Sequence, residues 1–268
     1  MCTTTQHYWR DDALPFVELR STFGSVQTYK PHFHAQLSFG AVISGETRAN
    51  CSGHERVLKQ GDLVLVAPHV VHSCNPVAGQ PRSYHMLYLD EAWSRENVGP
   101  VCGDISVIRD SALFAQYLEL MTSLPDMPAP EAAAELQRLL NVAIERSRSA
   151  KPAPHRRQLA EQIKQALLES IEKPATLDEL AEAFGCRKET LIRVFQRAFH
   201  ITPRAFVNNA RIERAKRQLK MGEEIAHVAA DLGFSDQAQL HRTFVSYTAS
   251  TPGQYRRARP PARINFRQ

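Results

Sequence analysis

Three histidines in the first third of the chain carry side chains that bind metal ions or small polar molecules. They are His32, His34 and His72. Neutral imidazole is a good ligand for zinc, iron, nickel and copper, and Cys74 or His85 could supplement such a site. Alternatively, the histidines bind a small organic molecule together with Tyr84, or they only cap strand ends. We expect a small-molecule site without metal and keep a divalent metal ion as the alternative.

A second set of polar side chains lies on a predicted pair of helices between Glu223 and Arg256. Apolar residues recur at helical spacing in the first helix, and Gly233 follows where a left-handed residue ends a helix. Ser235 or Asp236 can cap the second helix through a side-chain oxygen. The apolar positions are Ile225, Val228, Ala229 and Leu232 in the first helix and Leu240, Phe244 and Tyr247 in the second. The pattern predicts a helix-turn-helix, whose second helix can enter the major groove of DNA.

The chain contains this unit twice. The first-helix positions recur 48 residues earlier and the second-helix positions 49 residues earlier. The earlier copies are Leu177, Leu180, Ala181, Phe184 and Gly185, followed by Leu191, Arg193 and Phe195. Between the two units, Arg204 to Leu219 reads as one unbroken helix of roughly 24 Å. Such a spacer can hold two recognition helices about one DNA turn, roughly 34 Å, apart.

These residues resemble the AraC/XylS family of bacterial transcription regulators. The family's diagnostic pattern is A-x-x-x-G-F-S-D-Q-x-x-L-x-R-x-F followed by T-P-x-x-Y-R. The matching positions are Ala229, Gly233 to Gln237, Leu240, Arg242, Phe244, Thr251, Pro252, Tyr255 and Arg256. The resemblance covers about residues 157 to 257. It implies a sequence-specific regulator that binds double-stranded DNA, pairs as a homodimer and contacts RNA polymerase if it is an activator.

The recognition helices offer candidates for contacts to DNA, where phosphate contacts position a protein and base contacts specify the site. The resemblance places Glu189, Ile192 and Arg193 toward the bases. Arginine suits guanine, glutamate accepts from cytosine, isoleucine contacts only a thymine methyl group, and glutamine pairs with adenine. For Gln237 the alternative is helix capping, and for Arg242 it is a phosphate contact. The expected contacts are Arg187, Lys188, Glu189, Thr190, Ile192, Arg193, Arg197, Gln237, Gln239, His241, Arg242 and Arg256.

The first half of the chain reads as short strands separated by turns, over residues 36–44, 55–59, 63–67 and 83–89. This pattern predicts a small β-barrel or sandwich. The histidines and the spacing of Gly61, Pro68 and Asn75 resemble the two cupin motifs, and the family resemblance implies the same barrel. Glutamate is absent three or four residues after His34, which removes one cupin metal ligand, and His69 replaces the motif's turn glycine.

Charge and composition divide the chain into two parts. Residues 1–150 hold 12 Lys/Arg and 16 Asp/Glu, whereas residues 151–268 hold 21 Lys/Arg and 12 Asp/Glu. Only the second part therefore has the excess of positive charge that suits phosphate. We expect an α+β protein with a cupin-like sensing domain over 1–148, containing helices at 111–123 and 131–147 that pair subunits or pack on the barrel. A linker at 149–155 and a DNA-binding domain over 156–268 follow, with helix-turn-helix units at about 176–198 and 224–248.

The remaining features bear on compartment and on competing functions. Five scattered cysteines suit a reducing compartment, and neither a signal peptide nor a membrane span is expected, so we predict a cytoplasmic protein. The leading hypothesis is a non-enzymatic transcription regulator controlled by a small molecule bound in the barrel. Residues 72–76 resemble a segment of regulators found beside amino-acid exporters, and this resemblance favours an amino acid or a related metabolite over a sugar. The alternative is a cupin metalloenzyme fused to a DNA-binding module, which the missing glutamate disfavours.

Overall fold

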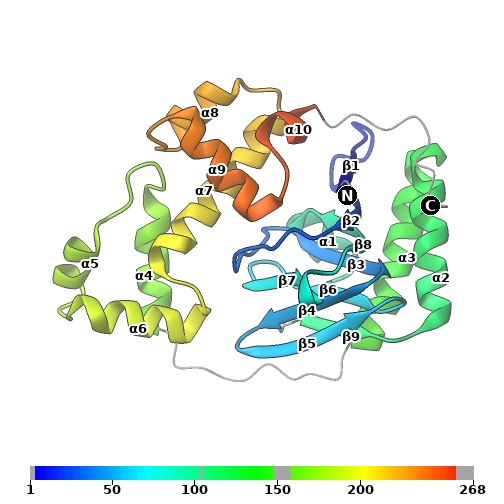
Figure 1. The fold of residues 1–268 in the computed structure, drawn as a ribbon, viewed down its shortest axis with the longest axis horizontal. Helices are drawn as coiled ribbons and strands as arrows, with labels where there is room; N and C mark the ends of the chain where they lie inside the picture. Colours follow the sequence, from blue (N-terminus) through cyan, green and yellow to red (C-terminus); the bar gives the residue numbers. More distant parts are fainter. Residues whose placement is uncertain (1–3, 102, 104, 148–157, 258–268) are drawn as a thin grey trace. The chain divides into compact units, whose positions relative to one another are not determined.

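The computed structural model describes residues 4–101, 103, 105–147 and 158–257, and the predicted linker at 149–155 lies outside them. Contacts divide the chain into two compact units. One unit contains the strands and helices α1 to α3, and the other contains helices α4 to α10 (Figure 1). The structure therefore has the predicted α+β class, with a β-rich unit followed by an all-helical one.

The β-rich unit is built from two antiparallel sheets. The larger sheet has the order β1-β2-β8-β3-β6-β9, and the smaller one has the order β5-β4-β7. The strands of the larger sheet are β1 (Thr5–Trp9), β2 (Val17–Ser25), β8 (Arg82–Leu89), β3 (Leu37–Ser44), β6 (Leu63–Val66) and β9 (Ile105–Ile108). Those of the smaller sheet are β5 (His54–Lys59), β4 (Glu46–Cys51) and β7 (His72–Pro76). The four predicted strands correspond to β3, β5, β6 and β8.

Three helices complete this unit: α1 (Glu91–Asn97), α2 (Ser111–Ser123) and α3 (Ala129–Ser147). Helices α2 and α3 run side by side along the sheet (Figure 1), and their apolar faces share one core with the strands. Tyr117 of α2 is fully buried there, and its hydroxyl donates to the Phe39 carbonyl oxygen of β3 at 3.2 Å. The predicted helix 131–147 begins two residues earlier, at Ala129, with Pro130 in its first turn.

The two faces of the larger sheet differ in composition. Along β3, β6 and β8, alternate residues such as Phe39, Leu65 and Leu87 belong to the core with α2 and α3. The intervening residues, such as Val42 and Val66, join a separate core with the smaller sheet. The second face also carries buried polar and aromatic side chains, which are Glu18, Arg20, Thr22, Ser38, Tyr84 and Tyr88. A mixed polar and apolar interior of this kind suits the binding of a small polar molecule.

The helical unit consists of two similar halves and a long helix between them. The first half contains α4 (Gln158–Glu169), α5 (Leu177–Ala183) and α6 (Lys188–Phe199). Helix α7 (Pro203–Lys220) has 18 residues and is therefore roughly 27 Å long. The second half contains α8 (Ile225–Asp231), α9 (Gln237–Thr248) and α10 (Pro252–Arg256). None of the helices in the described ranges is long and apolar enough to cross a lipid bilayer.

Candidate nucleic-acid interface and histidine site

The turn between the two helices of each helix-turn-helix is made in the same way. Gly185 and Gly233 adopt left-handed conformations, with φ of 59° and 69°. Each glycine donates its N–H to a carbonyl three residues back, and the next residue donates to a carbonyl five residues back, on Ala181 or Ala229. This pair of bonds is the Schellman motif, which ends a helix and redirects the chain. The repeat in the sequence is therefore a repeat in backbone geometry.

The residues that hold each pair of helices together also correspond. Leu191 and Phe195 of α6 are fully buried, and so are Leu240 and Phe244 of α9. The Phe195 ring packs against Phe206 of α7, with ring centroids 5.4 Å apart. Phe244 packs in the same edge-to-face manner on Tyr255 of α10, at 5.6 Å. These four side chains are core, as predicted, and they fix the outward faces of α6 and α9.

The helices α6 and α9 expose most of the side chains that were predicted to contact DNA. Arg193 and Arg242 are both exposed, and each is the sixth residue of its helix. Thr190 and Ile192 are half-buried, while the remaining exposed members of the predicted set are Arg187, Lys188, Glu189, Arg197, Gln237 and His241. The two arginines at matching positions are therefore the best pair of candidates for contacts to guanine.

Three predicted DNA contacts make structural bonds within the helical unit. Gln239 accepts the Ser235 N–H at 2.8 Å through Oε1, so it belongs to the cap of α9. Arg256 donates to the Glu223 carbonyl at 3.3 Å and pairs with Glu224 at 3.4 Å. Lys188 pairs with Asp178 of α5, at 2.6 Å. The sequence pattern missed these roles because each depends on a neighbouring helix or turn.

The cap of α9 also resolves an alternative left open by the sequence. Asp236 is the N-cap residue, and its carboxylate accepts the Gln239 N–H at 2.6 Å. This bond to the backbone lowers the pKa of Asp236 from its usual range. Gln237 is the first residue of the helix, so it does not cap α9, and its exposed side chain remains a candidate for base contact.

The two halves of the helical unit are connected through Arg211 of α7. Its Nε donates to the Ile171 carbonyl at 2.7 Å, and a terminal nitrogen donates to the Glu172 carbonyl at 3.0 Å. The same guanidinium group lies over the Phe234 ring, 5.5 Å from its centroid. Arg211 therefore links the segment after α4 to the turn between α8 and α9, and burial lowers its pKa.

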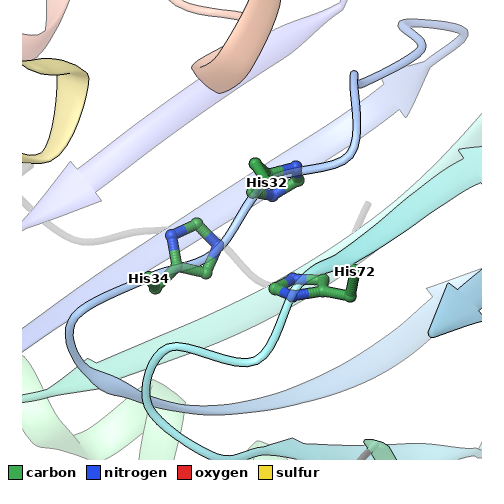
Figure 2. Close-up of side chains that lie close together, drawn as sticks. All are labelled: His32, His34 and His72. Carbon is green, nitrogen blue, oxygen red and sulfur yellow. The ribbon is translucent and has the colours of Figure 1, made fainter. Parts of the chain in front are cut away.

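The structure brings the three predicted histidines together (Figure 2). His32 and His34 lie on the segment before β3, and His72 begins β7. One ring nitrogen from each side chain lies within 4.8 Å of the others. His32 and His72 are buried and His34 is half-buried. The ring of Tyr88, which the sequence did not single out, lies 5.0 Å from His34 in an edge-to-face arrangement.

The other residues considered for this site lie elsewhere. His85 is fully buried on the opposite face of β8, where its Nδ1 bonds to the Ser21 hydroxyl at 2.8 Å. Cys74 is not part of the histidine group, and burial raises the pKa of its thiol to about 11. Tyr84 shares a face of β8 with Tyr88 but lies four residues further from the histidines, and its ring contacts the buried Arg20 and Arg82. His69, which stands where the cupin motif has its turn glycine, adopts a left-handed conformation with φ of 63°.

Comparisons with known proteins agree for both units. Residues 18–171 match the AraC-like ligand binding domain family, and residues 180–258 match a helix-turn-helix domain family. The chain is 26% identical over 235 residues to the uncharacterised HTH-type transcriptional regulator YbfI of Bacillus subtilis, covering 81% of this chain and 83% of that protein. A Staphylococcus aureus HTH-type regulator, SAS0078, is 38% identical over 86 residues, which is 12% of its length.

Solved structures show the same two-unit fold. The structure of ToxT from Vibrio cholerae O395 aligns with a TM-score of 0.57 at 12% identity, covering 95% of this chain and 96% of that one. The structure of ToxT bound to an unsaturated fatty acid aligns with a TM-score of 0.58, covering 94% and 93%. With the ligand-binding family matched over more than half of the chain and two helix-turn-helix units in place, the chain belongs to the AraC family of transcription regulators, with an N-terminal ligand-binding domain and a C-terminal DNA-binding domain.

Proposed function

We propose that this regulator reads two adjacent segments of the DNA major groove, one with α6 and the other with α9. The observation that carries the proposal is the matched exposure of Arg193 and Arg242 at the sixth position of the two helices. Both helices are anchored by buried phenylalanines, so both arginines project from rigid elements. Two recognition helices on one chain read segments about one DNA turn apart.

The first experiment determines which base pairs each arginine reads. An operator is selected from a random DNA library with the parent protein, and affinities of Arg193→Ala and Arg242→Ala are measured by fluorescence anisotropy on every single-base variant of it. Each substitution is expected to weaken binding about 5- to 150-fold, equivalent to 1–3 kcal/mol, and to abolish discrimination at one position. The two affected positions are expected to lie roughly 10 base pairs apart.

Phosphate contacts give a different result in the same assay. A variant that weakens binding equally on all sequences, with a reduced dependence on salt, has lost a phosphate contact and not a base contact. That outcome for both arginines would overturn the assignment of base reading. Affected positions next to each other would overturn the arrangement of two helices in successive grooves.

Two glutamines of α9 are expected to have different roles. Gln239 stabilises the start of the helix, whereas Gln237 contacts DNA bases. Gln239→Ala removes the acceptor for the Ser235 N–H and is expected to lower the free energy of unfolding by about 1 kcal/mol. Gln237→Ala, two residues away and exposed, is expected to change stability by less than about 0.5 kcal/mol and to weaken binding to adenine-containing sites. Chemical denaturation and anisotropy of both variants measure the two effects.

The β-rich unit controls DNA binding through a small molecule, and we place that molecule beside His34 and His72, against the buried face of the larger sheet that carries Tyr88 and Tyr84. One solved structure of ToxT contains a bound unsaturated fatty acid, and ToxT has the same two-unit fold as this chain. These two observations support an organic effector. A ligand of the folded state raises the unfolding temperature, and the rise grows roughly with the logarithm of the ligand concentration above Kd. A thermal-shift screen of the full chain with amino acids, organic acids and sugars therefore identifies the class.

The protein acts without catalysing a reaction, as a homodimer on cytoplasmic DNA, and contacts RNA polymerase if it activates transcription. The regulators to which it is similar support the non-enzymatic reading. Analytical ultracentrifugation with and without an operator fragment tests the dimer. Turnover of an effector found in the screen would instead favour the alternative of a cupin enzyme fused to a DNA-binding module.

A further inference from the structure

A buried guanidinium group lies on the face of the larger sheet that carries Tyr84 and Tyr88. It belongs to Arg20 of β2, which is 5% exposed and pairs in register with Met86, between the two tyrosines on β8. Its central carbon lies 5.7 Å from the centre of the Tyr84 ring and 5.7 Å from that of Tyr8, its register partner on β1. Contacts of this kind between a cation and aromatic rings stabilise the guanidinium group in one orientation.

The charges around Arg20 sum to a positive value. Glu18, two residues earlier on the same face, forms an ion pair with Arg10 at 2.6 Å. Glu18 is also the one buried carboxylate among the strands that the structure describes. One carboxylate thus accompanies two guanidinium groups, which leaves an excess of one positive charge. Because buried charge is costly without a counter-charge, this face favours an anion.

Two polar groups next to Arg20 have hydrogen-bonding capacity that the protein does not use. Thr22 of β2 and Gln6 of β1 pair in register, one pair further along the same face than Arg20 and Tyr8. Thr22 is fully buried, and within the described ranges neither its Oγ1 nor the Gln6 Nε2 has a hydrogen-bond partner. Buried polar groups are normally satisfied, so these two indicate a partner that is not part of the chain.

The side chain nearest to Arg20 in register is an adaptable one. A Cβ atom at Gly40 of β3 would overlap the Met86 sulfur, so Met86 leans toward β3 and away from Arg20 on β2. Methionine has a flexible side chain that repacks around a bound molecule at little cost. The neighbourhood of Arg20 can therefore accept a small ligand without a change in the strands.

We propose that Arg20, Thr22 and Gln6 bind the carboxylate group of the effector, which is a small organic acid. The guanidinium group forms two parallel N–H···O bonds with a carboxylate, and the amide and the hydroxyl each supply one more donor. The apolar part of the acid lies against the rings of Tyr8 and Tyr84. This inference rests on the proposed function, because it names the chemical class of the molecule that controls DNA binding.

The class is tested with acids and their uncharged amides. Full-length protein in a buffer without carboxylates is titrated calorimetrically with benzoate, phenylacetate and hexanoate, and with benzamide, phenylacetamide and hexanamide. At least one acid is expected to bind, and its amide roughly 10-fold or more weakly, because the amide has no charge to pair with Arg20. No binding of any acid to the folded protein, or equal affinity for acid and amide, would overturn the proposal.

Matched variants assign the carboxylate to Arg20. Arg20→Met is expected to weaken binding of the acid about 10- to 150-fold, and Arg20→Lys by less, since lysine keeps the charge but not the planar pair of donors. Arg56→Met, which removes an exposed arginine of β5, is expected to leave the affinity unchanged. Circular dichroism confirms that each variant is folded. Equal affinities of Arg20→Met and Arg56→Met would contradict the assignment.

Thr22→Val provides a second test that does not remove a charge. Its hydroxyl has no partner within the described part of the chain, so stability is expected to stay the same or rise, while the acid binds about 5-fold more weakly. A loss of stability with unchanged affinity for the acid would show a purely structural role and remove Thr22 from the site.

Operator binding separates this inference from the proposed function. Anisotropy with the selected operator is measured with and without the acid, on the parent and on Arg20→Met. An acid that binds through Arg20 without changing operator affinity supports the carboxylate site and contradicts control of DNA binding by this molecule. An uncharged compound that changes operator affinity equally in both proteins supports that control and overturns the carboxylate site.

Discussion

Gly233→Ala is expected to lower the free energy of unfolding of the helical unit by roughly 2–5 kcal/mol. Two effects add at this position. A residue with a Cβ atom is disfavoured in the left-handed conformation by about 1–2 kcal/mol, and Gly233 has φ of 69°. In addition, a Cβ atom would lie 2.0 Å from the Glu172 carbonyl oxygen, which is far inside van der Waals contact.

The Glu172 carbonyl cannot move aside without further loss. Arg211 donates to it at 3.0 Å and to the preceding Ile171 carbonyl at 2.7 Å. A shift that accommodates the added methyl group therefore breaks a charge-assisted hydrogen bond that connects the long helix α7 to the segment after α4. The strain also reaches Phe234, whose ring lies against the same guanidinium group.

Gly185 provides a matched control within the same chain. It has almost the same φ, 59°, and ends α5 with the same pair of hydrogen bonds, but a Cβ atom there would meet nothing within 4 Å. Gly185→Ala is thus expected to cost only about 1–2 kcal/mol, from conformation alone. Guanidinium unfolding followed at 222 nm measures both variants, and equal losses would show that the contact with Glu172 does not constrain the turn.

This contrast shows how much the sequence reveals about the DNA-binding unit. The repeat predicted both turns and both pairs of buried residues, because helical spacing and a glycine after the helix are local signals. The pattern treats Gly185 and Gly233 as equivalent, since the carbonyl that distinguishes them comes from a segment about 60 residues earlier in the chain. For the same reason the sequence did not reveal that Gln239, a predicted DNA contact, accepts the Ser235 N–H in the cap of α9.

In the β-rich unit the sequence identified strands more reliably than faces. Both faces of the larger sheet are buried, so alternation of polar and apolar residues does not show which core a side chain joins. The resemblance to the cupin motifs implies that His32, His34 and His72 lie close together, and their ring nitrogens lie within 4.8 Å of one another. Tyr88 beside them went unnoticed, and His85 was considered as a further ligand although it faces the opposite core.

The position of His85 leads to a prediction about pH. Burial lowers the pKa of His85 to about 4, from the usual 6.5, because the charged ring would lose its hydration. The unfolded chain therefore binds one more proton than the folded chain between these two values. Stability rises with pH where the unfolded state binds more protons, so His85 is expected to destabilise the fold as the pH falls from about 6.5 to about 4.

The full effect of this single group is about 3 kcal/mol, most of it reached by pH 4. Unfolding free energies of the parent and of His85→Asn, measured by denaturant titration at several pH values, separate it from the other titrating groups. The amide of asparagine keeps a partner for the Ser21 hydroxyl but does not gain a proton in this range. The difference in stability between the two proteins is therefore expected to shrink as the medium becomes more acidic.

A direct measurement distinguishes the physical cause. The imidazole signals of His85 in an NMR titration are expected to stay in the neutral form at pH 5, where an exposed histidine is mostly protonated. Parallel pH profiles for the parent and His85→Asn, or a His85 ring that protonates near pH 6.5, would contradict the prediction. Such a result would mean that water reaches the His85 ring where it packs against Ser21 and Phe23 of β2.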